Sequence, residues 1–138
     1  YYIKGNVLSE LKKYNEAIKC YNRTIEINPE YLDAYINKGF AFLQLNENFE
    51  AIECFNRAIE INPQHSNAYF NKGICLSTLK KFTEAIAVIN KAIDIDPQNS
   101  DTYIYKGNAL NKLNRKTEAI KCYDQAIEIN PQNSNAYM

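Results

Sequence analysis

Few residues of this chain are suited to covalent chemistry. Its 138 residues include a single histidine, His65, and four cysteines without a Cys-x-x-Cys pair. A general base near neutral pH is most often histidine, and we expect His65 to lie in a solvent-exposed connecting loop. Each glycine is isolated, so no glycine-rich phosphate loop is present. We therefore expect no catalytic residue, and this shortage of ligands also predicts no metal site and no cofactor.

The cysteines are better suited to packing than to bonding. Cys20, Cys54 and Cys122 share one position of an internal repeat, whereas Cys75 occupies another. Packed helices lie about 8 to 10 Å apart, but a disulfide needs Cα atoms within about 7 Å. Equivalent positions on successive repeats therefore do not pair. We expect free, buried thiols that act as small apolar side chains.

Asparagine amides are the main candidates for binding chemistry. Asn37 and Asn71 are one repeat apart, and Asn6 and Asn108 lie one helical turn further along in the outer repeats. An amide both donates and accepts hydrogen bonds, which suits the backbone of an extended peptide and ignores its side chains. The alternative is that duplicated repeats simply copied their asparagines.

Apolar side chains accompany the asparagines on the same helices. We assign them to the same candidate peptide-binding surface, in which Asn37, Asn71, Asn6 and Asn108 are joined by Tyr2, Ile36, Phe40, Phe70, Ile74, Ile104 and Tyr105. The alternative is that these side chains pack between adjacent helices. Phe40 and Phe70 are large for packing alone, which favours a binding surface.

A repeat must position these residues. Every glycine and every proline recurs at an interval of 34 residues, at Gly5, Gly39, Gly73 and Gly107 and at Pro29, Pro63, Pro97 and Pro131. Within each interval two apolar stripes with helical spacing are separated by a short polar turn. Each interval is therefore predicted to form two helices, and glycine in the first would allow a close crossing with the second.

Local residues predict where the helices begin and end. Hydroxyl and amide side chains are predicted to cap helix N-termini: Ser66, Ser100 and Ser134 before first helices, and Asn15, Asn48, Thr83 and Thr117 before second helices. Each proline follows Asn or Asp, and a residue before proline is driven out of helical geometry. The second helix should therefore end at that residue.

The repeat resembles the tetratricopeptide family over the whole chain. The resemblance is carried in the second unit by Tyr35, Gly39, Phe42, Ala51, Phe55, Ala58 and Pro63. It implies an all-α, right-handed superhelical stack of helix-turn-helix units, an α-solenoid. The units are residues 1–31 (partial), 32–65, 66–99 and 100–133, with a fifth beginning at 134–138. The chain is thus expected to be a slice, of about four repeats, from a longer array.

The resemblance also bears on the site. First helices line the concave surface of such arrays, and the asparagines resemble the ladder inside O-linked N-acetylglucosamine transferases. Lysines replace the family's usual leucine at Lys4, Lys38, Lys72 and Lys106, either to cover apolar surface with their stems or as a cationic rail for an acidic segment. Family members that clamp chaperone tails use cations where this chain has Tyr2, Asn67 and Asn71. A chaperone C-terminal tail is therefore an unlikely partner.

Composition narrows the partners. Sixteen basic residues balance sixteen acidic ones, so the chain lacks the charge that nucleic acids or anionic membranes require, and no apolar segment is long enough to span a bilayer. We expect a cytoplasmic, or cytoskeletal or ciliary, location.

Three functions agree with these features. The leading one is a non-catalytic scaffold that binds a protein or peptide in the concave groove. The alternatives are a structural spacer or assembly subunit in a large complex, and the substrate-binding arm of a glycosyltransferase-like enzyme.

Overall fold

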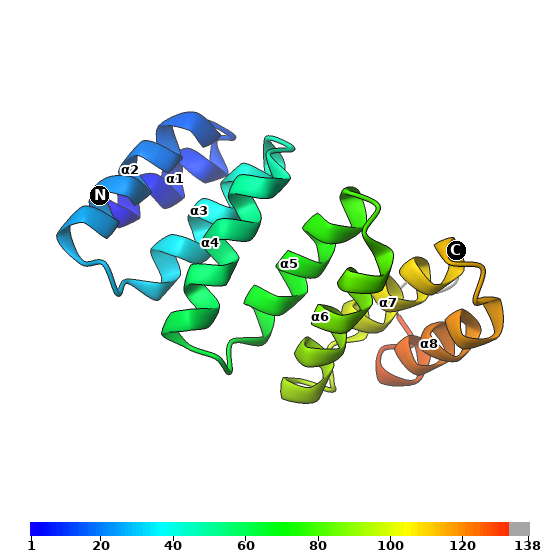
Figure 1. The fold of residues 1–138 in the computed structure, drawn as a ribbon. Helices are drawn as coiled ribbons and strands as arrows, with labels where there is room; N and C mark the ends of the chain where they lie inside the picture. The colour runs from blue at the N-terminus through cyan, green and yellow to red at the C-terminus, as the bar shows by residue number, and fades with distance from the viewer. Residues whose placement is uncertain (133–138) are drawn as a thin grey trace.

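The computed structural model describes residues 1–132 as a stack of eight α-helices (Figure 1). In chain order these are α1 (Tyr2–Glu10), α2 (Tyr14–Ile27), α3 (Leu32–Gln44), α4 (Asn48–Ile61), α5 (Ser66–Thr78), α6 (Phe82–Ile95), α7 (Ser100–Lys112) and α8 (Lys116–Ile129). Residues 1–132 contain no strand, and the two predicted helices per repeat are confirmed. The predicted start of a fifth unit and the cap at Ser134 lie outside the described residues.

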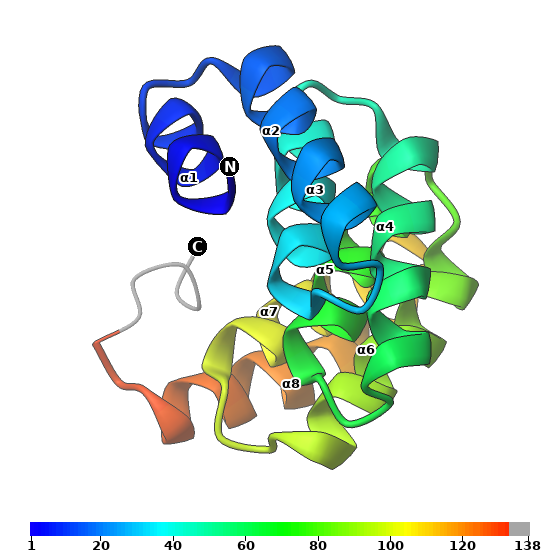
Figure 2. The ribbon, with the colours of Figure 1, turned by 90° about the vertical axis from the view of Figure 1, so that its left-hand side faces the viewer.

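The helices form two layers along a curved stack. Each first helix packs against the second helix of its own pair, and each second helix packs against the first helix of the next pair. The first helices α1, α3, α5 and α7 also contact one another in order, while within residues 1–132 no two second helices contact each other as closely. The stack therefore curves around the first helices, which form its inner layer (Figure 2).

Glycine permits the close crossing within each pair. A Cβ atom added to Gly73 would lie 2.5 Å from Cγ1 of Ile89, and one added to Gly39 would lie 2.7 Å from Cε1 of Phe55. Ile89 and Phe55 are fully buried. The same relation holds in the first and fourth pairs, between Gly5 and Tyr21 and between Gly107 and Tyr123. The predicted packing role of the glycines is confirmed.

The turn inside each pair has one residue in the left-handed region. In the third pair this residue is Lys80, with φ 62°. Its N–H donates to the carbonyl of Ser77, and the N–H of Lys81 donates to the carbonyl of Leu76. These two bonds satisfy carbonyls at the end of α5, as in a Schellman motif. The other pairs repeat this arrangement with Lys12, Asn46 and Asn114.

The predicted caps of the first helices are wrong by one residue. Ser66 and Ser100 are the first residues inside α5 and α7, and the caps are His65 and Asn99. Nδ1 of His65 accepts the N–H of Ala68 at 3.3 Å. His65 is thus a half-buried capping residue rather than an exposed loop residue.

The predicted caps of the second helices are also wrong. These helices begin at Tyr14, Asn48, Phe82 and Lys116, so Asn15, Thr83 and Thr117 lie inside them and Asn48 is the first residue of α4. The capping positions are Lys13, Glu47, Lys81 and Arg115, and none makes a side-chain capping bond. The left-handed turn between the two helices of a pair leads directly into the second helix, so no separate capping residue fits there.

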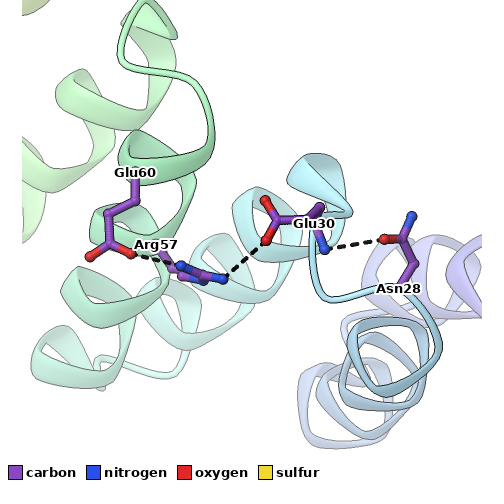
Figure 3. A network of polar contacts seen from close by, with 4 residues as sticks. All are labelled: Asn28, Glu30, Arg57 and Glu60. Carbon is purple, nitrogen blue, oxygen red and sulfur yellow. Dashed lines mark hydrogen bonds and ion pairs between the residues drawn. The ribbon is translucent and has the colours of Figure 1, made fainter.

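The second helices end where the prolines predict. Asn28, Asn62, Asp96 and Asn130 follow their last residues. Oδ1 of Asn28 accepts the backbone N–H of Glu30 at 3.1 Å, and the other three residues make the same turn. Figure 3 shows that Glu30 also pairs with Arg57, which pairs with Glu60. These ion pairs are exposed, so each contributes at most about 1 kcal/mol.

The cysteine prediction is confirmed. All four thiols are free and buried. Burial raises the pKa of Cys54 to about 11 and that of Cys75 to about 12. Because the protonated thiol is the less reactive form, these cysteines act as apolar packing residues.

The close crossing can be tested with Gly39→Leu. The new side chain would meet the ring of Phe55, which is enclosed in the core, so we expect a loss of more than about 2 kcal/mol in unfolding free energy. Lys91→Leu, at an exposed position of α6, should change it by less than about 0.5 kcal/mol. Urea unfolding followed by circular dichroism measures both, and equal midpoints would contradict the packing argument.

Candidate functional site

Two equivalent clefts lie between neighbouring first helices, on the inner layer of the stack. The first, of about 230 Å³, lies between α1 and α3 and is lined by Asn6, Ser9, Glu10, Tyr21, Asn37 and Phe40. The second, of about 490 Å³, lies between α5 and α7 and is lined by Ile74, Ser77, Thr78, Lys80, Phe82, Tyr105, Asn108, Ala109 and Lys112. Several positions of the second cleft are those of the first, two repeats later. The same positions of the repeat therefore form a cleft twice, with different lining residues.

A hydrogen-bond network lies at the first cleft, between α1 and α3. Nδ2 of Asn37 donates to the hydroxyl of Tyr2 at 3.0 Å and to Oδ1 of Asn6 at 2.9 Å. The hydroxyl of Tyr21 donates to the same Oδ1 of Asn6 at 2.8 Å. The network therefore joins α1, α2 and α3. It uses both N–H groups of the Asn37 amide, whose carbonyl oxygen remains as an acceptor.

Aromatic packing holds this network in place. The ring of Tyr2 lies against the rings of Tyr21 and Tyr31, with centroids 6.2 Å and 5.0 Å apart. Burial raises the pKa of Tyr21 to about 12. Its hydroxyl therefore stays protonated and remains a donor to Asn6 at neutral pH. Tyr2 therefore supports the hydrogen-bond network beside the first cleft but does not line the cleft itself.

The other predicted asparagine of this kind, Asn108, also has an internal partner. Its Oδ1 accepts the hydroxyl of Tyr123 at 2.6 Å, as Asn6 accepts that of Tyr21, and in both cases the tyrosine is 15 residues later. The second unit has Phe40 and Phe55 at these two positions, and the third has Ile74 and Ile89. A unit with asparagine at the first of these positions thus has tyrosine at the second, whereas a unit with an apolar residue at the first also has one at the second. This signal was present in the sequence and could have revealed the pairing.

Asn71 differs from the other three asparagines. Its side chain has no hydrogen-bond partner among residues 1–132, and it is half-buried on α5. Both its donor and its acceptor groups are available. Of the predicted ladder, Asn71 is the residue whose whole amide can bind an external backbone.

The predicted apolar residues divide into surface and core. Phe40 is 44% exposed and Tyr105 is 36% exposed. Phe70 lies edge-on to Tyr105 with centroids 5.2 Å apart. Ile36 is partly buried against a core cluster of Ala51, Phe55 and Cys75.

Ile104 belongs to the core. It is only 6% exposed and packs against Ala126, so it cannot support a bound segment. Ile104 therefore packs between helices, which was the alternative to its assignment to the binding surface.

The second cleft contains polar groups that sequence reasoning did not single out. The hydroxyl of Ser77 is buried and has no hydrogen-bond partner among the described residues, whereas Thr78 donates to the carbonyl of Ile74 at 3.0 Å. Lys80 and Lys112 are the charged residues of its lining. The cleft therefore combines an apolar wall with two lysines, while the Ser77 hydroxyl is enclosed.

No group of three or more His, Cys, Asp and Glu side chains in residues 1–132 is arranged to hold a metal ion. None of the helices described here has the length and apolar character needed to cross a bilayer.

Comparison with known proteins identifies the family. A TPR repeat model matches residues 5–46, and tetratricopeptide repeat models match residues 41–100 and 100–133. The chain belongs to the tetratricopeptide-repeat family. It is 42% identical over 38 residues to the TPR repeat-containing protein MJ0941 of Methanocaldococcus jannaschii, a match that spans 28% of this chain and 11% of that protein.

Solved structures share the fold. The crystal structure of MamA superposes with a TM-score of 0.90 at 20% identity, over 96% of this chain and 78% of that one. The first TPR of Spaghetti (RPAP3) bound to the HSP90 peptide SRMEEVD gives 0.75 at 25% identity, over 77% and 84%. The Arabidopsis OM64 TPR domain gives 0.76 at 28% identity, over 78% and 89%. The predicted all-α, right-handed superhelical stack is confirmed.

The different states of Asn37 and Asn71 can be tested by stability. Asn37→Ala removes two hydrogen bonds that cross from α3 to α1, so it should lower the unfolding free energy by about 1 to 3 kcal/mol. Asn71→Ala is the matched control one repeat later, and it should change stability by less than about 0.5 kcal/mol. Urea unfolding of both variants measures the difference. Equal losses would contradict the network.

Proposed function

We propose that this chain is a non-catalytic interaction module that holds an extended segment of a partner protein along its inner layer. The observation that supports this most directly is the cleft between α5 and α7. Its volume of about 490 Å³ falls in the range of about 300 to 1,000 Å³ that is usual for ligand sites. Tyr105, which is exposed, forms part of its apolar lining.

The chemistry of the cleft indicates how such a segment would bind. A large apolar side chain of the partner would enter the cleft beside Ile74 and Tyr105. The amide of Asn71 would hold the neighbouring backbone in the direction of α3. The carbonyl oxygen of Asn37 would extend this row by one repeat.

The spacing of the helices suits an extended segment. Packed helices lie about 8 to 10 Å apart, and a strand rises about 3.3 Å per residue, so three residues of partner pass each unit. Each amide contact contributes only about 0.5 to 1.5 kcal/mol, while association costs at least about 4 kcal/mol of lost freedom. Affinities near micromolar are therefore expected.

Peptide selection tests this proposal. Peptides enriched from a phage-displayed random library on the immobilised chain should bind Tyr105→Ala at least about tenfold more weakly, because this variant removes the cleft wall. Asn71→Ala, which removes one amide contact, should weaken binding about two- to tenfold. Fluorescence anisotropy of labelled selected peptides measures the affinity.

The control is Phe49→Thr, which removes an exposed ring from α4 in the outer layer. It should leave peptide affinity unchanged. Selected peptides that lose affinity to Phe49→Thr but not to the inner-layer variants would contradict the inner site and favour the assembly function.

The chaperone peptide provides a separate test. The corresponding clamp positions hold Tyr2, Asn67 and Asn71, and Tyr2 is engaged by Asn37 and two aromatic rings. A terminal carboxylate would have no cation there. Isothermal titration calorimetry with SRMEEVD should therefore detect no micromolar binding, and a micromolar dissociation constant would remove this restriction on partners.

A further inference from the structure

A third cleft lies on the other side of α5, away from the proposed peptide site. Its volume is about 460 Å³, and its walls come from α4, α5 and α6. Leu76 of α5 and Leu79, which directly follows this helix, face this cleft, whereas Ile74, Ser77 and Thr78 face the inner one. At 3.6 residues per turn these two sets lie on opposite sides of the helix.

The repeat acts as an internal control for this cleft. Where the second unit has Phe49, the other units have Asn15, Thr83 and Thr117. Where the third unit has Ala87, the others have Lys19, Glu53 and Lys121. Both positions line the same cleft. The chain therefore replaces polar or charged residues by apolar ones on both walls at one boundary between units.

At this surface the exposed Phe49 side chain stands next to a recess. Its side chain is 63% exposed, although it borders an apolar recess formed with Leu76, Leu79 and Val88. A large exposed ring beside an apolar cleft marks an interaction surface. Neither the fold nor the inner site accounts for this ring.

We propose that two copies of this chain associate through this outer cleft about a two-fold axis, with the Phe49 ring of each copy in the cleft of the other. A two-fold interface must be complementary to itself, and this surface holds the projecting ring and the recess side by side. Its rim carries both signs of charge, in Lys72, Lys81 and Glu84. Within residues 1–132 none of these three has an ion-pair partner, so Glu84 of each copy can pair with a lysine of the other.

The net charge of the chain does not oppose the association of two copies. The chain has no net charge, so two copies approach without long-range repulsion. The inner cleft between α5 and α7 lies on the opposite side of α5 and remains open in such a dimer. The proposal is therefore independent of the proposed peptide-binding function.

Sedimentation equilibrium over a range of concentrations tests the proposal. The chain should show a reversible monomer–dimer equilibrium. Phe49→Thr should weaken dimerisation about tenfold or more, because the central aromatic residue of a small interface carries much of its affinity. Ala87→Lys should weaken it similarly by placing a charge in the recess. Both substitutions install residues that other units carry at these positions, so the fold should persist, as circular dichroism can verify.

Phe40→Thr is the matched control, because it removes a similarly exposed phenylalanine from the inner layer. It should leave the dimerisation constant unchanged. A chain that stays monomeric at every concentration would overturn the proposal. Equal weakening by Phe40→Thr and Phe49→Thr would also overturn it, since association would then not use the outer cleft.

Discussion

The close approach of two helices at a glycine determines most of this structure. At Gly73 no side chain fits, because Ile89 of the paired helix occupies the space where a Cβ atom would be. This contact brings the first and second helices of a pair together and fixes how they cross. The turn between them must then reverse the chain in few residues, which it does through a left-handed residue. The curvature follows, because the first helices contact one another and the second helices are spread outside them.

The residue that fills the space above each glycine also controls the inner surface. Where this residue is Tyr21 or Tyr123, its hydroxyl needs an acceptor, and Asn6 or Asn108 supplies it. Where it is Phe55 or Ile89, the inner position can be apolar, as in Phe40 and Ile74. The residue type in the core thereby determines the residue type at the paired position of the inner surface. The clefts of the first and third units differ in chemistry for this reason, although their backbones repeat.

Sequence reasoning predicted the fold well because its strongest signals are local. Proline and the residue before it restrict the backbone directly, so the ends of the second helices were predicted correctly. The helix starts were predicted poorly, because the turns place Lys12 or Lys80 in a conformation more typical of glycine or asparagine. Only Asn46 and Asn114 are of a residue type that marks such a turn, and hydroxyl and amide residues just inside the helices were taken for caps.

The binding surface was less predictable, because it depends on contacts between helices. Spacing placed Ile104 and Phe70 at equivalent positions, yet Ile104 is buried and Phe70 is only partly so. That difference arises from neighbouring side chains, which periodicity does not report. The partners of Asn6 and Asn37 could be found only by comparing two helices at once. The roles of the predicted surface residues in binding stay predictions.

The network at the first cleft also has a mechanical consequence. Directional hydrogen bonds from Asn37 to Tyr2 and Asn6, with the Arg57–Glu30 ion pair, brace the boundary between the first two units. The later boundaries rely more on apolar contacts, which allow packed helices to slide by small amounts. We therefore expect the solenoid to be stiffer at the boundary between its first two units than at the later boundaries. Tension along the stack would lengthen its pitch first in the third and fourth units.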